Sequence, residues 1–259
     1  MAAWALRFFR PEGGLLLETH SESPAGAGIS GSSALMVATT AALARYTGRP
    51  LSKESIRVIS QNLEAQVIRV PTGCQDYYPA LYGGVNAIEL GVDAITRRAI
   101  PVPAREIASR FILAYTGVPR KSGINNWEVF KKHVEGDKRV QRSFEHISEI
   151  SREMSAALGS QAWDTVARLL REEWVLRRKN APGISTPKIE HLVKVAARHG
   201  ALGAKVCGAG GGGCVVFMAA PGAASSVAQA LRTAGACILP LRLATTGLRQ
   251  TSQPANSST

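Results

Sequence analysis

Hydrophobic residues recur at helical spacing in several stretches of the chain. Ile56, Ile59 and Leu63 fall three or four residues apart, which places them on one face of a predicted helix that Ser52 can cap. An alanine-rich stretch, residues 32–46, predicts the helix before it. The same spacing predicts further helices over residues 126–134, 140–158, 161–179, 187–199 and 223–233.

Shorter apolar runs between these stretches indicate strands. The expected strands cover residues 15–19, 85–90, 110–115, 214–218 and 237–243. No internal repeat is present. Strands and helices alternate in unequal blocks, which favours an α+β fold. The last residues, from 245 onward, are polar and are expected to fray.

Composition excludes several classes of protein. Of 259 residues, 45% are hydrophobic, which is enough for a core. The longest strongly apolar run, Cys214 to Ala220, is far shorter than the ~20 residues needed to cross a bilayer. Arg7, Arg10 and Glu12 interrupt any apolar core of a signal peptide. The four cysteines form no CxxC pair, which argues against a zinc site or disulfide scaffold and fits the cytoplasm. The expectation is a cytoplasmic protein without a membrane partner.

The chain carries a net charge of +12, and many of its basic residues lie between Arg97 and Arg142. A nucleic-acid-binding protein would use such charge on phosphates and usually adds aromatic residues for stacking. Aromatic content is only 6%, and no known nucleic-acid motif occurs. A solvated basic surface is therefore the favoured interpretation, and attraction of anionic small molecules comes second.

The first sign of chemistry is a glycine-rich loop before the alanine-rich helix, residues 24–34 (PAGAGISGSSA). Glycines allow close approach of the backbone to a ligand, and the unpaired N–H groups of a helix N-terminus attract anions. Hydroxyls of Ser30, Ser32 and Ser33 could add phosphate contacts or a Mg²⁺ ligand. The spacing matches neither a Walker A loop nor a dinucleotide fingerprint. A tight structural turn is the alternative interpretation.

Two further segments accompany this loop. Residues 203–214 (GAKVCGAGGGGC) contain four consecutive glycines before a predicted buried strand, a sign of close backbone approach. Residues 73–86 (GCQDYYPALYGGVN) offer a lone carboxylate, Asp76, and Glu64 lies twelve residues before it on a helix. Taken alone, Asp76 could be a loop cap and Glu64 a solvated helix residue.

Together, PAGAGISGSSA, GCQDYYPALYGGVNAIEL and GAKVCGAGGGGC resemble motifs of the GHMP kinases. Residues 115–137 and 182–205 resemble the bacterial sugar-1-kinase branch, which includes heptose 7-phosphate kinases. The resemblance extends from about residue 4 to 243. It implies a two-domain α+β sandwich with a ribosomal protein S5 domain 2-like amino part and a ferredoxin-like carboxyl part. The expected boundaries are residues 1–100 for the ATP phosphate-loop domain, 101–245 for the C-terminal domain and 246–259 for a flexible tail.

The resemblance also implies roles for individual residues. Asp76 corresponds to the catalytic aspartate that accepts a proton from the acceptor hydroxyl or orients that hydroxyl. Ser33 and Glu64 correspond to the Mg²⁺ ligands. The residues expected to bind ATP are Pro24, Gly26, Ala27, Gly28, Ser30, Gly31, Ser32, Ser33, Gly208, Gly210 and Gly211.

For the acceptor, the expected substrate is a sugar or sugar phosphate. Arg120, Asn125 and Asn126, together with Lys121, lie in a glycine-containing loop after a predicted strand. An arginine there would suit the distal phosphate of a sugar phosphate. A basic surface loop is the alternative. The implied activity is ATP-dependent phosphorylation of the anomeric hydroxyl of a heptose 7-phosphate or a related sugar.

The chain departs from the family pattern in three places. Tyr77 stands where the branch usually has Gln, and Cys207 where Ser or Thr is common. Family members also carry strands and a substrate-binding motif well before the phosphate loop, which begins here at Pro24. The expectation is a chain without those amino-terminal strands. Their loss should expose a sheet edge at residues 15–19, with poor solubility or a homodimer that covers the edge.

Three other functions stay open. A family fragment could bind nucleotide without turnover. Another enzyme of the superfamily, such as a fucose or galactose kinase or a diphosphate-substrate decarboxylase, would share the motifs. A basic nucleic-acid-binding protein is the third, and steep salt dependence of binding without ATP binding would favour it.

Overall fold

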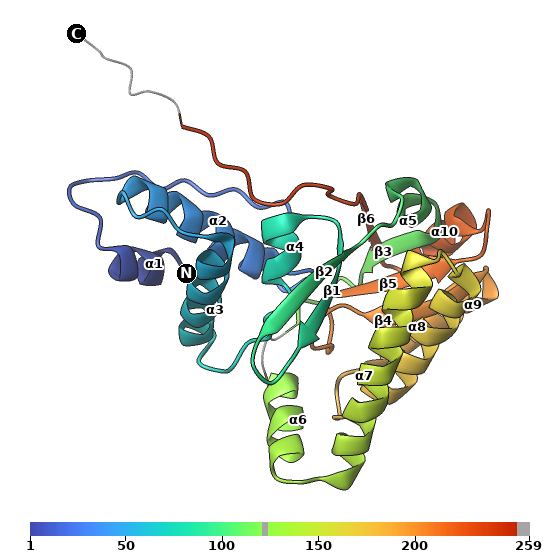
Figure 1. Cartoon of the computed structure of the whole chain (residues 1–259). Coiled ribbons are helices and arrows are strands. Elements are labelled where there is room, and N and C mark those ends of the chain that lie inside the picture. The colour runs from blue at the N-terminus through green and yellow to red at the C-terminus, as the bar shows by residue number, and fades with distance from the viewer. Residues whose placement is uncertain (121–123, 253–259) are drawn as a thin grey trace.

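The computed structural model of the chain describes residues 1–120 and 124–252, and Figure 1 shows the arrangement of its elements. The helices are α1 (Ala2–Phe9), α2 (Gly31–Tyr46), α3 (Lys53–Ile68), α4 (Tyr77–Tyr82), α5 (Ala104–Arg110), α6 (Ile124–Val134), α7 (Lys138–Gly159), α8 (Trp163–Arg177), α9 (Pro187–Arg198) and α10 (Ala224–Thr233). The strands are β1 (Val85–Leu90), β2 (Ile95–Ile100), β3 (Phe111–Tyr115), β4 (Ala201–Val206), β5 (Cys214–Ala219) and β6 (Cys237–Leu239).

The carboxyl half is built on an antiparallel sheet in the order β4-β5-β3-β6. Helices cover both faces of β5, which explains its almost uninterrupted apolar sequence. Phe217 packs in the main core with Ile189 and Leu192 of α9 and Leu231 of α10. The next residue, Met218, points to the other face and packs with residues of α7 and α8.

The amino half is mainly helical. Phe9 of α1 packs with Met36 and Leu43 of α2 and Leu63 of α3. β1 and β2 form a separate two-stranded antiparallel sheet (Figure 1). These layers confirm the predicted α+β class.

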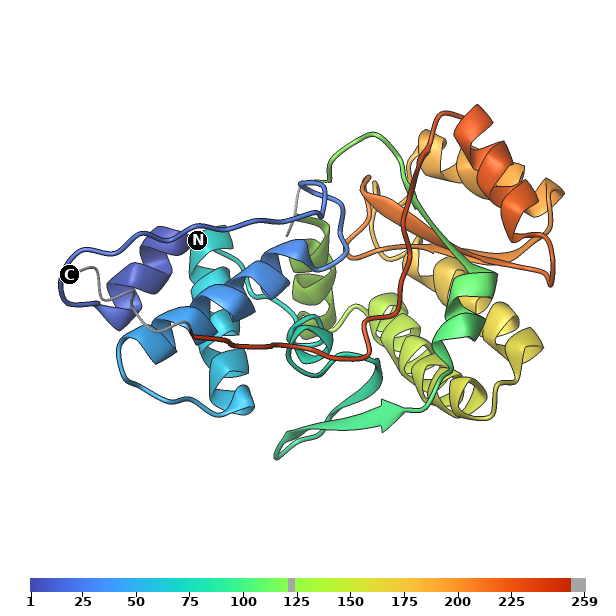
Figure 2. The same cartoon turned by 90° about the horizontal axis from the view of Figure 1, so that it is seen from above.

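The chain after β6 returns to the amino half. In Figure 2 this segment crosses from the sheet toward α2 and α4. The Gly84 N–H donates to the Ala244 carbonyl at 2.6 Å, and the Gln250 side-chain amide donates to the Ala41 carbonyl at 2.8 Å. Residues 245–252, expected to fray, therefore pack against the helices.

Most predicted helices are present, and the Ser52 hydroxyl accepts from the Ser55 N–H at 3.0 Å, as a cap should. The strand predicted at residues 15–19 is wrong. That segment is irregular, and Leu16 is 85% exposed, because in the described chain no strand lies beside it to pair its backbone. The exposed edge expected there is therefore absent. β6 ends at Leu239 instead of 243, because Pro240 has no N–H to donate.

The described basic residues between Arg97 and Arg142 are spread over several elements. Arg97 lies over the Tyr82 ring at 4.1 Å, and Arg110 lies over the Trp163 ring at 4.8 Å. Among the described residues, no helix is both long and apolar enough to cross a membrane.

Candidate active site

The first glycine loop lies directly before α2. Gly26 at φ +69° and Gly28 at φ +78° are left-handed positions that turn the chain tightly before α2. Ser30 stands at the N-cap position at φ 65°, and its side chain makes no capping hydrogen bond. α2 therefore begins at Gly31, and the N–H groups of its first turn have no intrahelical partner. With the positive end of the helix dipole, they form a site suited to phosphate.

Three segments far apart in sequence are joined here by backbone hydrogen bonds. The Cys214 N–H donates to the Ala27 carbonyl at 2.7 Å, and the Arg120 N–H donates to the Gly26 carbonyl at 3.2 Å. The Gly213 N–H donates to the Val118 carbonyl at 2.8 Å. The first glycine loop thus lies against the second one and against the segment after β3, which fixes its shape.

Glu64 of α3 lies beside the first turn of α2. It is only 6% exposed, and three hydroxyls donate to its carboxylate: Ser32 at 2.6 Å, Ser33 at 2.9 Å and Tyr77 at 2.6 Å. No ion pair to Glu64 occurs in residues 1–120 and 124–252. Hydroxyl donors stabilise a buried carboxylate but leave its negative charge in place.

Tyr77 keeps its proton in this arrangement. Burial is the first cause that raises the pKa of its phenol above the usual range, and the hydrogen bond to Glu64 is the second. The side chain is fully buried, so the hydroxyl is a permanent donor toward the carboxylate. This contact gives a physical reason for tyrosine after Asp76.

Asp76 precedes α4 and belongs to the same electrostatic environment. Burial raises the pKa of its carboxyl above the ordinary value. A hydrogen bond from Ser30 and the positive charge of Arg120 act in the opposite direction, and the charge of Glu64 adds to the rise. A carboxylate with a raised pKa is a better proton acceptor than an exposed aspartate.

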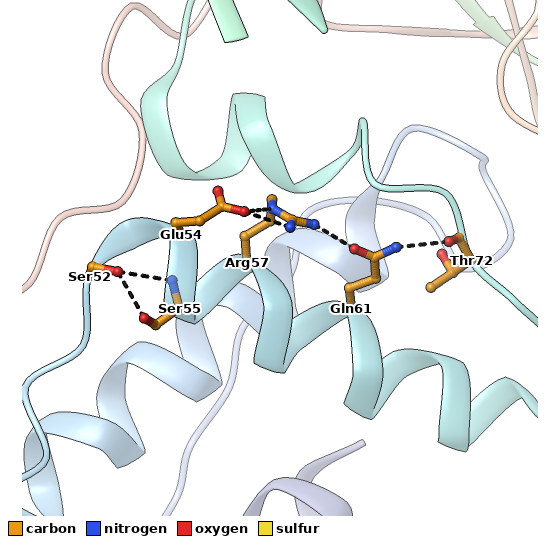
Figure 3. Close-up of polar contacts among 6 residues, drawn as sticks. All are labelled: Ser52, Glu54, Ser55, Arg57, Gln61 and Thr72. Atoms are coloured by element: carbon orange, nitrogen blue, oxygen red, sulfur yellow. Dashed lines mark hydrogen bonds and ion pairs between the residues drawn. The ribbon is translucent and has the colours of Figure 1, made fainter. Parts of the chain in front are cut away.

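A chain of polar contacts positions the segment before Asp76 (Figure 3). Arg57 of α3 is buried, and it donates to Glu54 at 2.6 Å and to the Gln61 side-chain oxygen at 2.6 Å. The Gln61 amide then donates to the Thr72 carbonyl at 3.1 Å. These contacts tie the loop that carries Asp76 to the same helix that carries Glu64.

The oxygen atoms at this site suit a Mg²⁺ ion that both the protein and the phosphates coordinate. Within the described residues, no group of three or more His, Cys, Asp or Glu side chains could hold a metal alone. Mg²⁺ uses one or two protein oxygens, with water and substrate phosphates as its other ligands. The Glu64 carboxylate and the Ser33 hydroxyl, 2.9 Å apart beside the helix N-terminus, supply such oxygens.

The structure gathers most of the predicted site residues. Four of the predicted parts lie around the N-terminus of α2: the loop from Pro24 to Ser33, Glu64, Asp76 and the second loop from Gly208 to Gly211. Arg120 also lies there. The backbones of Asn125 and Asn126 belong to α6, and Lys121 lies outside the described residues.

Sequence reasoning missed the contacts of Tyr77 and Arg57. Tyr77 is noticeable in sequence only as a departure from a pattern, and its hydroxyl meets a carboxylate thirteen residues away. For Arg57, the sequence did contain a signal. Glu54 lies three residues before Arg57 and Gln61 four residues after it, and both spacings bring side chains together on a helix.

Comparison with known proteins agrees with these motifs. The family described as GHMP kinases N terminal domain matches residues 1–84, and GHMP kinases C terminal matches residues 154–237. The D-glycero-alpha-D-manno-heptose 7-phosphate kinase of Campylobacter jejuni is 29% identical over 223 residues, 83% of this chain and 64% of that protein. The chain thus spans just under two thirds of that relative's length.

Two other similar proteins act on different molecules by name. The mevalonate kinase of Pyrococcus horikoshii is 30% identical over 250 residues, 91% of this chain and 68% of that protein. The crystal structure of Lactococcus lactis galactokinase complexed with galactose has a TM-score of 0.71 at 20% identity, with 87% of this chain and 68% of that one covered. The last of these shows a shared fold. The two matched family regions and the 30% identical relative establish that the chain belongs to the GHMP kinases.

Proposed function

We propose that this chain transfers the terminal phosphoryl group of ATP to a hydroxyl of a small sugar or sugar phosphate. The observation that carries this proposal is the place of two carboxylates at the N-terminus of α2. Glu64 accepts hydrogen bonds from Ser32 and Ser33 of the first turn, and Asp76 lies near enough for the charge of Glu64 to raise the pKa of its carboxyl. Two glycine loops that lie against each other surround them. Phosphoryl transfer requires positioning and stabilisation of charge more than covalent chemistry, and this arrangement supplies both.

Each part of the site then has a role. Backbone N–H groups of the first loop and of the first turn of α2 bind the phosphates. Ser33 and Glu64 would hold Mg²⁺, which neutralises phosphate charge when it is bound. Asp76 accepts the proton of the attacking hydroxyl while the bond between the terminal phosphorus and the bridging oxygen breaks and ADP leaves.

The proposed acceptor is the anomeric hydroxyl of a heptose 7-phosphate or a related sugar. The similarity to the Campylobacter jejuni heptose 7-phosphate kinase supports this choice. The similarity to a mevalonate kinase makes mevalonate a second candidate acceptor. Both acceptors offer a hydroxyl to the same base, so the family and the geometry of the carboxylates do not distinguish them.

The test is acceptor-dependent release of ADP from ATP with Mg²⁺. The panel contains heptose 7-phosphate, free heptose, galactose, fucose and mevalonate, with Asp76→Asn beside the wild type. We expect turnover with a sugar and a fall in kcat of about 10²- to 10⁴-fold in Asp76→Asn, because removal of a general base costs that much. Turnover with mevalonate alone would replace the proposed acceptor. A folded wild-type chain that binds ATP but releases no ADP with any acceptor would contradict the proposed activity.

A further inference from the structure

The side chain of Arg120 occupies the junction of the two glycine loops. A Cβ atom at Gly28 would lie 2.8 Å from the Arg120 Nε, and a Cβ atom at Gly208 would lie 2.8 Å from its Cζ. The guanidinium therefore fills the space that side chains at these two glycines would need. It touches both loops that are proposed to surround the phosphates.

The half-buried Arg120 lacks the partners that the buried Arg57 has. Arg57 is paired with Glu54 and Gln61, whereas no side-chain ion pair or hydrogen bond of Arg120 occurs within residues 1–120 and 124–252. The Nε of Arg120 is buried without a hydrogen-bond partner. Buried polar groups in native proteins almost always have partners, so this N–H lacks an acceptor, and the positive charge of the guanidinium favours an anionic one.

The place of Arg120 distinguishes between two phosphates. Its positive charge is near enough to lower the pKa of Asp76, the proposed base, and its Cζ lies against the loop at Gly208. A sugar hydroxyl that reacts at Asp76 holds the distal phosphate of a sugar phosphate at the opposite end of the sugar. The phosphoryl group that moves between ATP and that hydroxyl lies close to both Asp76 and the glycine loops.

Given the proposed function, we infer that Arg120 binds the phosphoryl group in transfer and not the distal phosphate of the acceptor. The planar guanidinium can donate two parallel hydrogen bonds to phosphate oxygens. Because the equatorial oxygens carry the charge of the transition state, a fixed cation there lowers the barrier. This assignment differs from the sequence-based expectation, which placed Arg120 on the distal phosphate.

The test compares Arg120→Gln and Arg120→Lys with the wild type, in the full chain. Arg105→Gln, an exposed arginine on α5, is the matched control. Calorimetry measures the binding of ADP and of a non-transferable ATP analogue, both with Mg²⁺. In Arg120→Gln we expect ADP affinity within 3-fold of wild type and analogue affinity at least 10-fold weaker, with partial rescue in Arg120→Lys. Melting curves must show that the variants are folded.

Kinetics on the panel gives a second readout. We expect kcat to fall about 100-fold or more in Arg120→Gln, while the KM for the acceptor changes less than 3-fold. A rise in acceptor KM specific to the phosphorylated sugar, with kcat retained, would overturn the inference in favour of the distal phosphate. Equal weakening of ADP and analogue, or no change in either, would also overturn it. If the wild type turns over no acceptor, the proposed function fails, and the binding comparison still decides the role of Arg120.

Discussion

Two buried glutamates of this chain, Glu64 and Glu173, have the same exposed fraction, 6%, and opposite surroundings. Glu173 of α8 forms ion pairs with Arg177 at 2.5 Å and with Lys205 of β4 at 3.0 Å. Glu64 has three hydroxyl donors and no cation among the described residues. The fold gives Glu173 two cationic partners, whereas it gives Glu64 none among the described residues.

The pKa of Glu173 reflects these two partners. Burial raises it, but Lys205 and then Arg177 more than offset the rise, so the pKa lies below the ordinary value of a glutamate. Burial of a carboxylate is costly unless it is paired, so fold stability alone accounts for Glu173 but not for Glu64. Under the proposed function, the absence of an internal cation distinguishes the carboxylate that would hold Mg²⁺ from the structural one more clearly than burial does.

The largest expected effect is on stability, at Glu173. Glu173→Gln leaves the half-buried cations of Lys205 and Arg177 without their carboxylate, so we expect a loss of about 3 kcal/mol in the free energy of unfolding, the low end for a broken buried pair. Urea unfolding followed by circular dichroism measures it. Glu153→Gln, which removes an exposed partner of Arg168, is the control and should cost less than about 1 kcal/mol. Equal effects of the two variants would mean that the pairing of Glu173 is not structural.

At Glu64, the effect should fall on activity instead. Glu64→Gln keeps the shape of the side chain and removes an unneutralised charge, but its amide nitrogen cannot accept a hydrogen bond as the carboxylate oxygen does. We expect these two effects to offset each other and the melting temperature to change little. We expect kcat/KM for the phosphoryl transfer to fall about 100-fold, the usual cost of one electrostatic contact to the transition state. A Glu64→Gln variant that unfolds as readily as Glu173→Gln, with normal activity per folded molecule, would show that both glutamates are structural.

The smallest expected effect is the dependence of stability on pH. It has opposite signs for Asp76, in the candidate site, and for Glu173. The raised pKa of Asp76 means that the folded chain prefers the protonated form. Stability from this group is therefore lost as the pH rises from about 3.9, the ordinary aspartate value, through the raised pKa. Asp76→Asn should become more stable than wild type over that window and remain so at pH 7.

Glu173 behaves in the reverse way. Its lowered pKa contributes stability above about 4.3, the ordinary glutamate value, and that stability disappears as the pH falls through the lowered pKa. The deficit of Glu173→Gln should therefore shrink in acid. Unfolding curves at a series of pH values measure both differences, and parallel pH profiles for the two variants would refute the assigned surroundings.

Local sequence signals were sufficient for part of the fold. Helical spacing and caps predicted α2, α3 and α9, because those signals act within a few residues. β4 was missed, since its sequence, ALGAKV, has little strand propensity and becomes a strand only by pairing with β5. β2 has two arginines and likewise depends on its partner β1.

The candidate site divides in the same way. The two glycine loops were predictable because each is continuous in sequence, whereas the roles of Glu64 and Asp76 were expected only from the resemblance to the GHMP kinases. The place of Arg120 between Gly28 and Gly208 joins residues about ninety positions apart, and no local pattern contains that contact. No local pattern contains the hydrogen bonds to Glu64 either, because Ser32 and Ser33 belong to α2 and Glu64 belongs to α3.

The most direct test of the contrast between the two glutamates is the effect of Mg²⁺ on ADP binding, measured by calorimetry. Wild type, Glu64→Gln and Glu153→Gln are titrated with ADP in the presence and absence of Mg²⁺. If Glu64 is kept for a cation, Mg²⁺ should tighten ADP binding in wild type and Glu153→Gln and have little effect in Glu64→Gln. An equal gain in ADP affinity in all three proteins would contradict the account, because Glu64 would then not contribute to Mg²⁺ binding.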